Sequence, residues 1–237
     1  MKMGTVVRNI PRSAADQLKT LSQCGVATVH EAMGRTGLMQ PYMRPIYAGA
    51  QVAGNAVTVL AHPGDNWMLH VAAELCCPGD LLVVAVSAEN TDGMFGELLA
   101  TSMHARGVQA LVIDAGCRDL AELTRMKFPV WSRAVSAKGT IKATLGNVNT
   151  PIICAGCLVH AGDAVIADDD GVAVVPHKEI AGVISASQQR IAREDTKRAR
   201  LAAGELGMDI ENMRPALKEL GLTYYETLEQ VPGMEKA

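Results

Sequence analysis

The sequence predicts an α/β fold with a helical extension at its C-terminus, and three observations carry that prediction. The run 81–86 is entirely apolar, as expected of a strand buried on both faces of a parallel sheet. A helix-like segment over 94–106 and a strand-like run over 109–114 follow it, which together make a βαβ unit. Hydrophobic residues form 49% of the 237-residue chain and aromatic residues only 3%, so we expect a large aliphatic core.

Two short helices are expected near the N-terminus, as a cover for the sheet. Ser13 can cap a helix over 13–22, and Gly34 can close a second helix over 26–34. The first long strand is predicted over 52–61, which is rich in β-branched residues.

Turn residues separate the next elements. The segment His62-Pro-Gly-Asp-Asn66 leads from the first strand into a helix predicted over 67–77. Pro78-Gly79-Asp80 then leads into the apolar strand 81–86.

The second half of the chain is predicted to be β-rich after one more helix over 119–126. Its strand-like segments are 129–134, an alternating run at 139–146, 152–159, 163–167 and 172–175. The last two are joined by Asp168-Asp-Asp-Gly171, which suggests either a metal site or a hairpin turn. Successive carboxylates point apart and lack the alternating spacing of a calcium loop, so the hairpin turn is favoured.

A long helix is predicted from His177, and we place a domain boundary there. Residues 1–176 would form the α/β catalytic domain, and residues 177–237 a helical extension. Apolar side chains recur at helical spacing only to Ile191, and the segment 193–200 is highly charged. Such a helix spans roughly 40 Å, long enough to reach a neighbouring subunit.

Charge and composition exclude several classes of partner. The net charge is −3, aromatic residues are few, and no basic stripe precedes the mixed-charge run 190–200, so a nucleic acid is not expected. Arg8, Arg12, Asp16 and Lys19 interrupt the first twenty residues, so neither a signal peptide nor a membrane helix is predicted. The expectation is a soluble, cytoplasmic protein that does not bind a membrane.

The six cysteines are interpreted as reduced, mostly buried thiols. Cys154-Ala-Gly-Cys157 could hold zinc or do redox chemistry. No second Cys-x-x-Cys is present, and His160 alone does not complete a ligand set, so small buried residues in a strand are favoured.

The pair Arg118-Asp119 stands where the strand 109–114 gives way to a helix. Glu97 lies 21 positions earlier, at the predicted start of the preceding helix. Ligands of α/β sheets bind beyond the carboxyl ends of strands, where helix N-termini offer unpaired N–H groups to anions. The pair could also merely cap a helix, but Gly93, Gly96 and Gly116 leave the backbone bare for close ligand approach.

These residue types suit a small carboxylate and a divalent metal. Asp119 and Glu97 offer the oxygen ligands that Mg²⁺ or Mn²⁺ prefers. Arg118 can grip a carboxylate whose oxygens also accept from the N–H groups of Leu98 and Leu99, beside Gly96. A metal next to a 2-oxo acid stabilises an enolate, the difficult intermediate when the adjacent carbon–carbon bond breaks.

The chain resembles the 4-hydroxy-4-methyl-2-oxoglutarate / 4-carboxy-4-hydroxy-2-oxoadipate aldolases nearly end to end. The resemblance lies in Glu97, Arg118-Asp119, His62-Pro-Gly-Asp-Asn-Trp67, Val29-His-Glu-Ala-Met-Gly34 and Gly139-Thr-Ile-Lys-Ala-Thr-Leu-Gly-Asn-Val-Asn149. It implies an RraA-like α-β-β-α sandwich, a class II pyruvate aldolase and a trimer or dimer of trimers. It also implies side activity as an oxaloacetate decarboxylase and a place in protocatechuate or gallate breakdown.

The resemblance also implies roles for the site residues. Asp119 would bind the metal directly and Glu97 through water, although well-described members carry Asp at the latter position. Arg118 would hold the pyruvyl end and stabilise the enolate. Glu194 would reach the metal from a neighbouring subunit; by itself it belongs to a solvated helix face.

Asn66 and Lys142 resemble family positions near the substrate. Lys142 suits a distal carboxylate, but it could equally be an exposed strand lysine, or the amine of a Schiff-base aldolase. The sequence leaves open which C4 substituent the substrate carries.

Two functions other than aldol cleavage are alternatives for this sequence. The same fold serves a protein-binding regulator of ribonuclease E, which is the alternative from a different class. A menaquinone methyltransferase is disfavoured, because no Gly-rich strand-to-helix loop stands out for S-adenosylmethionine.

Overall fold

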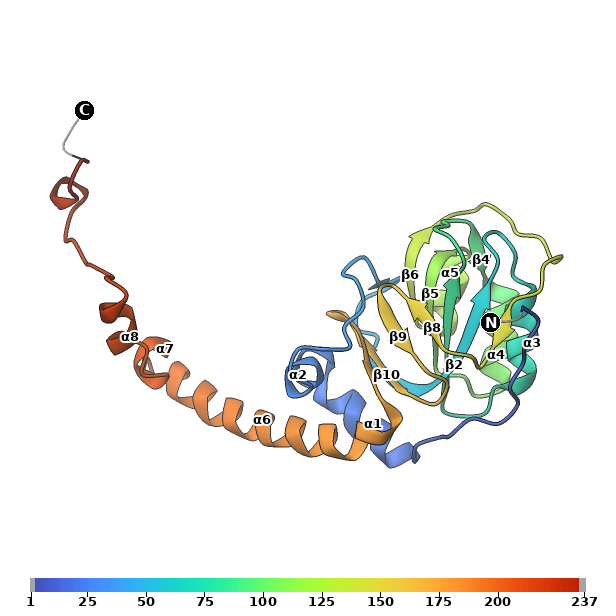
Figure 1. Ribbon diagram of the computed structural model, residues 1–237, viewed down its shortest axis with the longest axis horizontal. Helices are drawn as coiled ribbons and strands as arrows, with labels where there is room; N and C mark the ends of the chain where they lie inside the picture. The colour runs from blue at the N-terminus through green and yellow to red at the C-terminus, as the bar shows by residue number, and fades with distance from the viewer. Residues whose placement is uncertain (1–2, 235–237) are drawn as a thin grey trace. The chain divides into compact units, whose positions relative to one another are not determined.

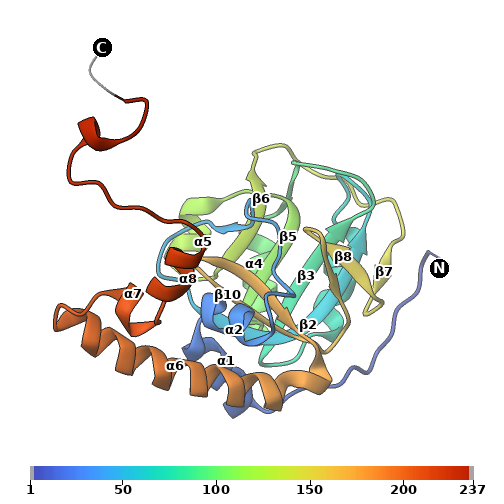
Figure 2. The same cartoon turned by 60° about the vertical axis from the view of Figure 1, so that its left-hand side comes forward.

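The computed structural model describes residues 3–234, and the segment 44–175 contains a mixed nine-stranded sheet (Figure 1). Four parallel strands form the middle of the sheet, in the order β6, β5, β3, β2, and they run side by side in a second view (Figure 2). Their bounds are Val130–Val135, Ala110–Cys117, Asp80–Val86 and Val52–Ala61. Antiparallel strands β10 (Ala164–Asp168) and β11 (Gly171–Val175) extend the sheet beyond β2.

The two faces of the sheet carry separate apolar cores. One core packs under helices α3 (Trp67–Leu75), α4 (Glu97–Ala105) and α5 (Leu120–Met126). The other contains Trp131 and lies under the hairpin β8–β9. Strands β2, β3 and β5 supply alternate residues to each core, which is why the run 81–86 is apolar throughout. The predicted mixed α/β class is confirmed.

Helices α1 (Ala15–Cys24) and α2 (Val26–Ala32) pack against β2, β10 and β11, close to where two N-terminal helices were predicted. The predicted hairpin turn at 168–171 anchors this region. One Asp168 carboxylate oxygen accepts the Val26 N–H at 2.8 Å and the other accepts the Asp170 N–H. These carboxylate oxygens are committed to the fold.

Three sequence predictions need correction. The helix predicted over 94–106 is a short strand β4 (Gly93–Phe95) followed by α4, because residues 93–95 pair with β5. The strand predicted over 152–159 is the hairpin β8 (Ile152–Cys154) and β9 (Cys157–Val159), with Ala155 and Gly156 at positive φ in the turn. The alternating run at 139–146 is a loop with one bridge, from Ile141 to Asp65.

Small elements complete the main sheet. Strand β1 (Arg44–Pro45) pairs with β6, and β7 (Asn147–Val148) pairs with β2. A 3₁₀ turn, η1 (His177–Glu179), follows β11 and leads into α6 (Ile180–Ala202).

The chain divides into two compact units after Arg190, inside α6. In the first unit, Ile180, Val183 and Ser187 of α6 are buried. The second unit continues α6 and adds α7 (Gly207–Ile210), α8 (Arg214–Glu219) and η2 (Leu228–Gln230). The domain boundary predicted at 176 and the reach to a neighbouring subunit stay predictions.

The described cysteines are all free thiols, and only Cys77 is exposed. Burial raises the pKa of the Cys154 thiol and of the Cys157 thiol. A raised pKa keeps a thiol protonated and unreactive, in keeping with the prediction of small buried residues. Among residues 3–234, no helix is long and apolar enough to cross a membrane.

Candidate active site

Arg118 and Asp119 follow the carboxyl end of β5 directly. The Arg118 N–H donates to the Phe95 carbonyl of β4 at 2.8 Å, which holds this end of the chain beside the start of α4. Asp119 has φ 60° and ψ 40°, the left-handed conformation, and is the N-cap residue of α5. Aspartate is one of the few side chains that adopt this conformation readily.

The Asp119 carboxylate caps the neighbouring helix rather than its own. Its Oδ2 accepts the N–H of Glu97, the first residue of α4, at 3.0 Å. A Cβ at Gly96 would lie 2.3 Å from the same oxygen, so only glycine permits this approach. The capping alternative is therefore real, yet the Asp119 side chain remains 40% exposed and can face a ligand as well.

A cleft of about 130 Å³ opens beside this pair. Residues from α3, β4, α4, the β5 end and the loop 139–146 line it: Asn66, His70, Met94, Gly96, Leu98, Leu99, Arg118, Asp119 and Lys142. All six residues predicted to bind substrate are in this set. Arg118 Nε lies 3.7 Å from Asp119 Oδ2, and its side chain is 42% exposed, so the guanidinium can reach a ligand.

Several polar groups in the cleft have no protein partner among the described residues. The first hydrogen bond at the start of α4 runs from Ala100 N–H to the Gly96 carbonyl, which leaves the N–H groups of Leu98 and Leu99 unused. Asn66 donates its Nδ2 to the Met94 carbonyl at 3.1 Å, while its buried Oδ1 accepts nothing. Unpaired donors and a buried unpaired acceptor indicate a place for a polar ligand.

Asp65 fixes the loop that carries Lys142. Its Oδ2 accepts the N–H groups of Ala143 and Thr144, and its Oδ1 accepts that of Trp67. Burial alone would raise the pKa of Asp65, but these backbone hydrogen bonds outweigh it and lower that pKa. The carboxylate thus stays charged and holds the loop against α3.

The other predicted metal ligands are placed differently. The Glu97 carboxylate turns along its own helix and accepts the Thr101 hydroxyl at 2.9 Å, so only its backbone meets Asp119. Glu194 lies on the part of α6 in the second unit. The metal roles of Asp119, Glu97 and Glu194 stay predictions.

The oxygen donors of the cleft suit some divalent cations better than others. Among residues 3–234, no group of three or more His, Cys, Asp and Glu side chains could hold a metal ion. Asp119 nevertheless offers hard oxygens at an exposed position, whereas the Glu97 carboxylate is turned toward Thr101. Mg²⁺ needs few protein ligands and keeps several waters, so Asp119 suits such an ion, but the residues do not form a closed zinc site.

His70 was missed by the sequence analysis. It lies one helical turn after Asn66 on α3 and lines the same cleft. Burial lowers the pKa of His70, and the nearby positive charge of Lys142 lowers it further. The i, i+4 spacing from Asn66 is the signal that could have revealed it.

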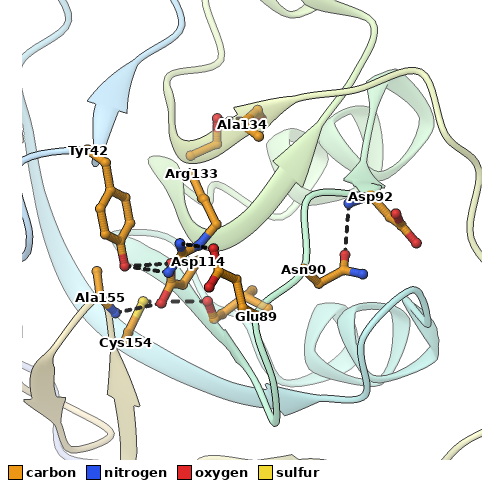
Figure 3. A network of polar contacts seen from close by, with 11 residues as sticks. Tyr42, Glu89, Asn90, Asp92, Asp114, Arg133, Ala134, Cys154 and Ala155 are labelled. Atoms are coloured by element: carbon orange, nitrogen blue, oxygen red, sulfur yellow. Dashed lines mark hydrogen bonds and ion pairs between the residues drawn. The ribbon is translucent and has the colours of Figure 1, made fainter.

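A second polar cluster lies on the opposite face of β5 (Figure 3). Arg133 donates to Asp114 Oδ1 at 2.8 Å, to Glu89 at 3.0 Å and to the Tyr42 hydroxyl at 2.6 Å. The other Asp114 oxygen accepts the Ala155 N–H at 3.0 Å. Every charge in this cluster meets a protein partner, so it ties loops to the sheet.

Comparison with known proteins agrees with this architecture. The family model "RraA-like: Aldolase/RraA" matches residues 26–174, more than half of the chain. The chain therefore belongs to the RraA-like family.

Similar proteins are named either as aldolases or as relatives of a ribonuclease inhibitor. Proteins from Halalkalibacterium halodurans and Burkholderia multivorans, each named "Putative 4-hydroxy-4-methyl-2-oxoglutarate aldolase", are 28% and 30% identical to it. Each match covers 65% of this chain, and 74% and 96% of the respective relative. The structure of Streptomyces coelicolor RraAS2, described as an unusual member of the RNase ES inhibitor RraA protein family, matches with a TM-score of 0.71 at 24% identity, over 80% of this chain and 99% of that one. The last likeness concerns the fold alone.

Proposed function

We propose that this chain is a divalent-metal-dependent aldolase that cleaves a 4-hydroxy-2-oxo acid. The substrate would be 4-hydroxy-4-methyl-2-oxoglutarate or 4-carboxy-4-hydroxy-2-oxoadipate, and the products pyruvate with pyruvate or oxaloacetate. One observation carries the proposal: Arg118 and Asp119 lie together in a cleft beside the open N-terminus of α4. The names of the two relatives support the same reaction.

The substrate's 2-oxo acid end is complementary to this part of the cleft. The unused N–H groups of Leu98 and Leu99 would receive its carboxylate, as helix N-termini do for anions. When the C3–C4 bond breaks, its electrons pass to C3 and the 2-oxo oxygen gains negative charge. Arg118, always charged, would stabilise that oxygen.

A Mg²⁺ or Mn²⁺ ion would be held by Asp119, with Glu97 acting through water. When bound, such an ion supplies a Lewis acid that stabilises the same developing charge. Glu97 would orient the water that takes the proton from the C4 hydroxyl, and C3 would then regain a proton to give pyruvate. Glu194 would complete the ligand set from a neighbouring subunit of a trimer or dimer of trimers.

The proposal includes a side activity and a metabolic place. Loss of the β-carboxylate from oxaloacetate leaves the same pyruvate enolate, so the site would also decarboxylate oxaloacetate. The aldol substrates arise in protocatechuate and gallate breakdown, where this reaction would be the last step.

The test is pyruvate release from both aldol substrates, before and after metal removal. We expect activity to disappear in excess chelator and to return with Mg²⁺ or Mn²⁺. Full activity in chelator would contradict the proposal. Inactivation by borohydride in the presence of pyruvate would instead favour a Schiff base at Lys142.

A second candidate function is protein binding that inhibits a ribonuclease, as the description of the Streptomyces coelicolor structure suggests for that protein's family. Protein binding of this kind does not require an exposed carboxylate beside Arg118, so the Arg118–Asp119 pair favours the aldolase. Tight association with a ribonuclease E-type enzyme, together with absence of pyruvate release from either aldol substrate, would reverse the ranking.

A further inference from the structure

The wall of the cleft formed by α3 carries two side chains that face a ligand, Asn66 and His70. Asn66 precedes α3 directly and His70 follows one turn later, so both side chains face the cleft, where Lys142 faces them from the loop 139–146. Asn66 is only 7% exposed, and its Oδ1 has no partner. The buried, unpaired Oδ1 of Asn66 is independent evidence that a ligand binds on this side of the cleft.

His70 differs from the other histidines of the described chain. Each of those has a partner: His30, His62, His160 and His177 make hydrogen bonds or an ion pair, and the His104 ring lies against Phe128. Among residues 3–234, His70 has no hydrogen bond, ion pair or ring contact, although it lines the cleft beside Lys142. A neutral imidazole has one donor and one acceptor available for a bound molecule.

Charge decides which ligand this wall favours. The cleft holds two permanent cations, Arg118 and Lys142, which match two carboxylates. The ionisable groups around His70 are Lys142, Arg118 and Asp119 in the cleft, and Glu74 on its own helix, which is paired with Arg8. An ordinary histidine is already mostly neutral above pH 7, and both burial and Lys142 lower the pKa of His70 further. It therefore offers no charge to a third carboxylate.

Resting on the proposed function, we propose that His70 determines which C4 substituent the chain accepts. The dicarboxylate 4-hydroxy-4-methyl-2-oxoglutarate presents a methyl group to the imidazole at no electrostatic cost. The tricarboxylate 4-carboxy-4-hydroxy-2-oxoadipate brings a third carboxylate there, for which the described residues of the cleft hold no cation beyond Arg118 and Lys142. This chain is therefore selective for the dicarboxylate.

The test is the ratio of kcat/KM for the dicarboxylate to kcat/KM for the tricarboxylate. It is measured for the unmodified chain, His70→Arg and His70→Asn, with oxaloacetate decarboxylation measured in parallel. His104→Arg is the matched control, because it adds the same charge at an exposed position at the end of α4. Circular dichroism establishes that each variant is folded.

The unmodified chain should favour the dicarboxylate by at least about 10-fold, as expected for an unpaired charge. His70→Arg should shift the ratio toward the tricarboxylate by about 10-fold or more, while His70→Asn and His104→Arg keep it. An active His70→Arg protein with an unchanged ratio overturns the role of His70. If the unmodified chain acts on none of the three substrates, the proposed function itself fails, and the inference with it.

Discussion

Two aspartates near the end of β5, Asp114 and Asp119, differ in burial and in the number of their partners. Asp114 lies within the strand, is 16% exposed, and is bound by Arg133, Tyr42 and the Ala155 N–H. Asp119 lies two residues after the strand, is 40% exposed, and accepts one backbone N–H from Glu97. The Asp114 carboxylate is thus fully partnered within the protein, whereas the Asp119 carboxylate has one backbone donor and a loose ion pair with Arg118.

The difference separates groups that hold the fold from groups that face a ligand. A buried charge without partners is costly, so the Asp114 cluster must be complete for the sheet to be stable. An exposed, poorly paired charge adds little stability. The Arg118–Asp119 pair contributes little to the fold and remains available for chemistry.

The largest expected effect is the loss of catalysis on substitution of Arg118 in the Arg118–Asp119 pair. Arg118→Ala removes the cation that would stabilise the enolate oxygen, so kcat/KM for pyruvate release should fall by about 100- to 1,000-fold. The control Arg125→Ala removes an exposed arginine of α5 and should leave kcat/KM unchanged. Equal activity in both variants would show that Arg118 is not used.

Substitutions in the polar cluster around Asp114 and Arg133 should lower the stability of the fold instead of its activity. Arg133→Met leaves Asp114 without its cation, and the free energy of unfolding in urea should fall by about 3 kcal/mol. The control Arg35→Met breaks an ion pair with Glu31 at a position where the arginine is 74% exposed, and should change the free energy of unfolding much less. A loss no larger than that of the control would mean that the cluster does not stabilise the sheet.

Gly96 tests whether the position of the Asp119 carboxylate matters. In Gly96→Ala the new Cβ would lie 2.3 Å from Asp119 Oδ2, so the carboxylate must move. We expect kcat/KM to fall by roughly 10-fold, as small displacements at active sites often cost. Gly182→Ala is the control, since a Cβ there meets nothing within 4 Å on α6; its activity should be unaffected, and a similar loss in both would refute the geometry.

The smallest effect is a pH dependence of stability. Burial, followed by the hydrogen bond to Asp114, raises the pKa of Tyr42 to about 12 from 10.0. Between these values the unfolded chain loses the phenol proton and the folded chain keeps it, so this contribution to stability falls as pH rises from about 10 to 12. In Tyr42→Phe that part of the slope should be absent in urea titrations; an identical slope in both proteins would contradict the shifted pKa.

The sequence was sufficient to predict the central strands and the edge where the cleft lies. Apolar runs mark β2, β3 and β5 because both faces of these strands are buried. Strand β4 was not predicted, because its three residues are extended only through pairing with β5, which is not local in the sequence.

The candidate site was predictable to a similar degree. Arg118 and Asp119 follow a strand that the sequence identifies, and the residues predicted to bind substrate line the same cleft. The sequence could not reveal that Asp119 caps α4 from a left-handed position, since this depends on how closely two segments approach. The sequence analysis did not single out His70, and the fold places it in the cleft, one helical turn after Asn66.

The most direct test compares Asp114→Asn with Asp119→Asn in stability and activity together. Asparagine tolerates the left-handed backbone, so Asp119→Asn should keep its free energy of unfolding within about 0.5 kcal/mol while pyruvate release falls by about 100-fold or more. Asp114→Asn should lose about 2–3 kcal/mol of stability and retain kcat/KM per folded molecule. Full activity in Asp119→Asn, or loss of stability there rather than in Asp114→Asn, would contradict the account.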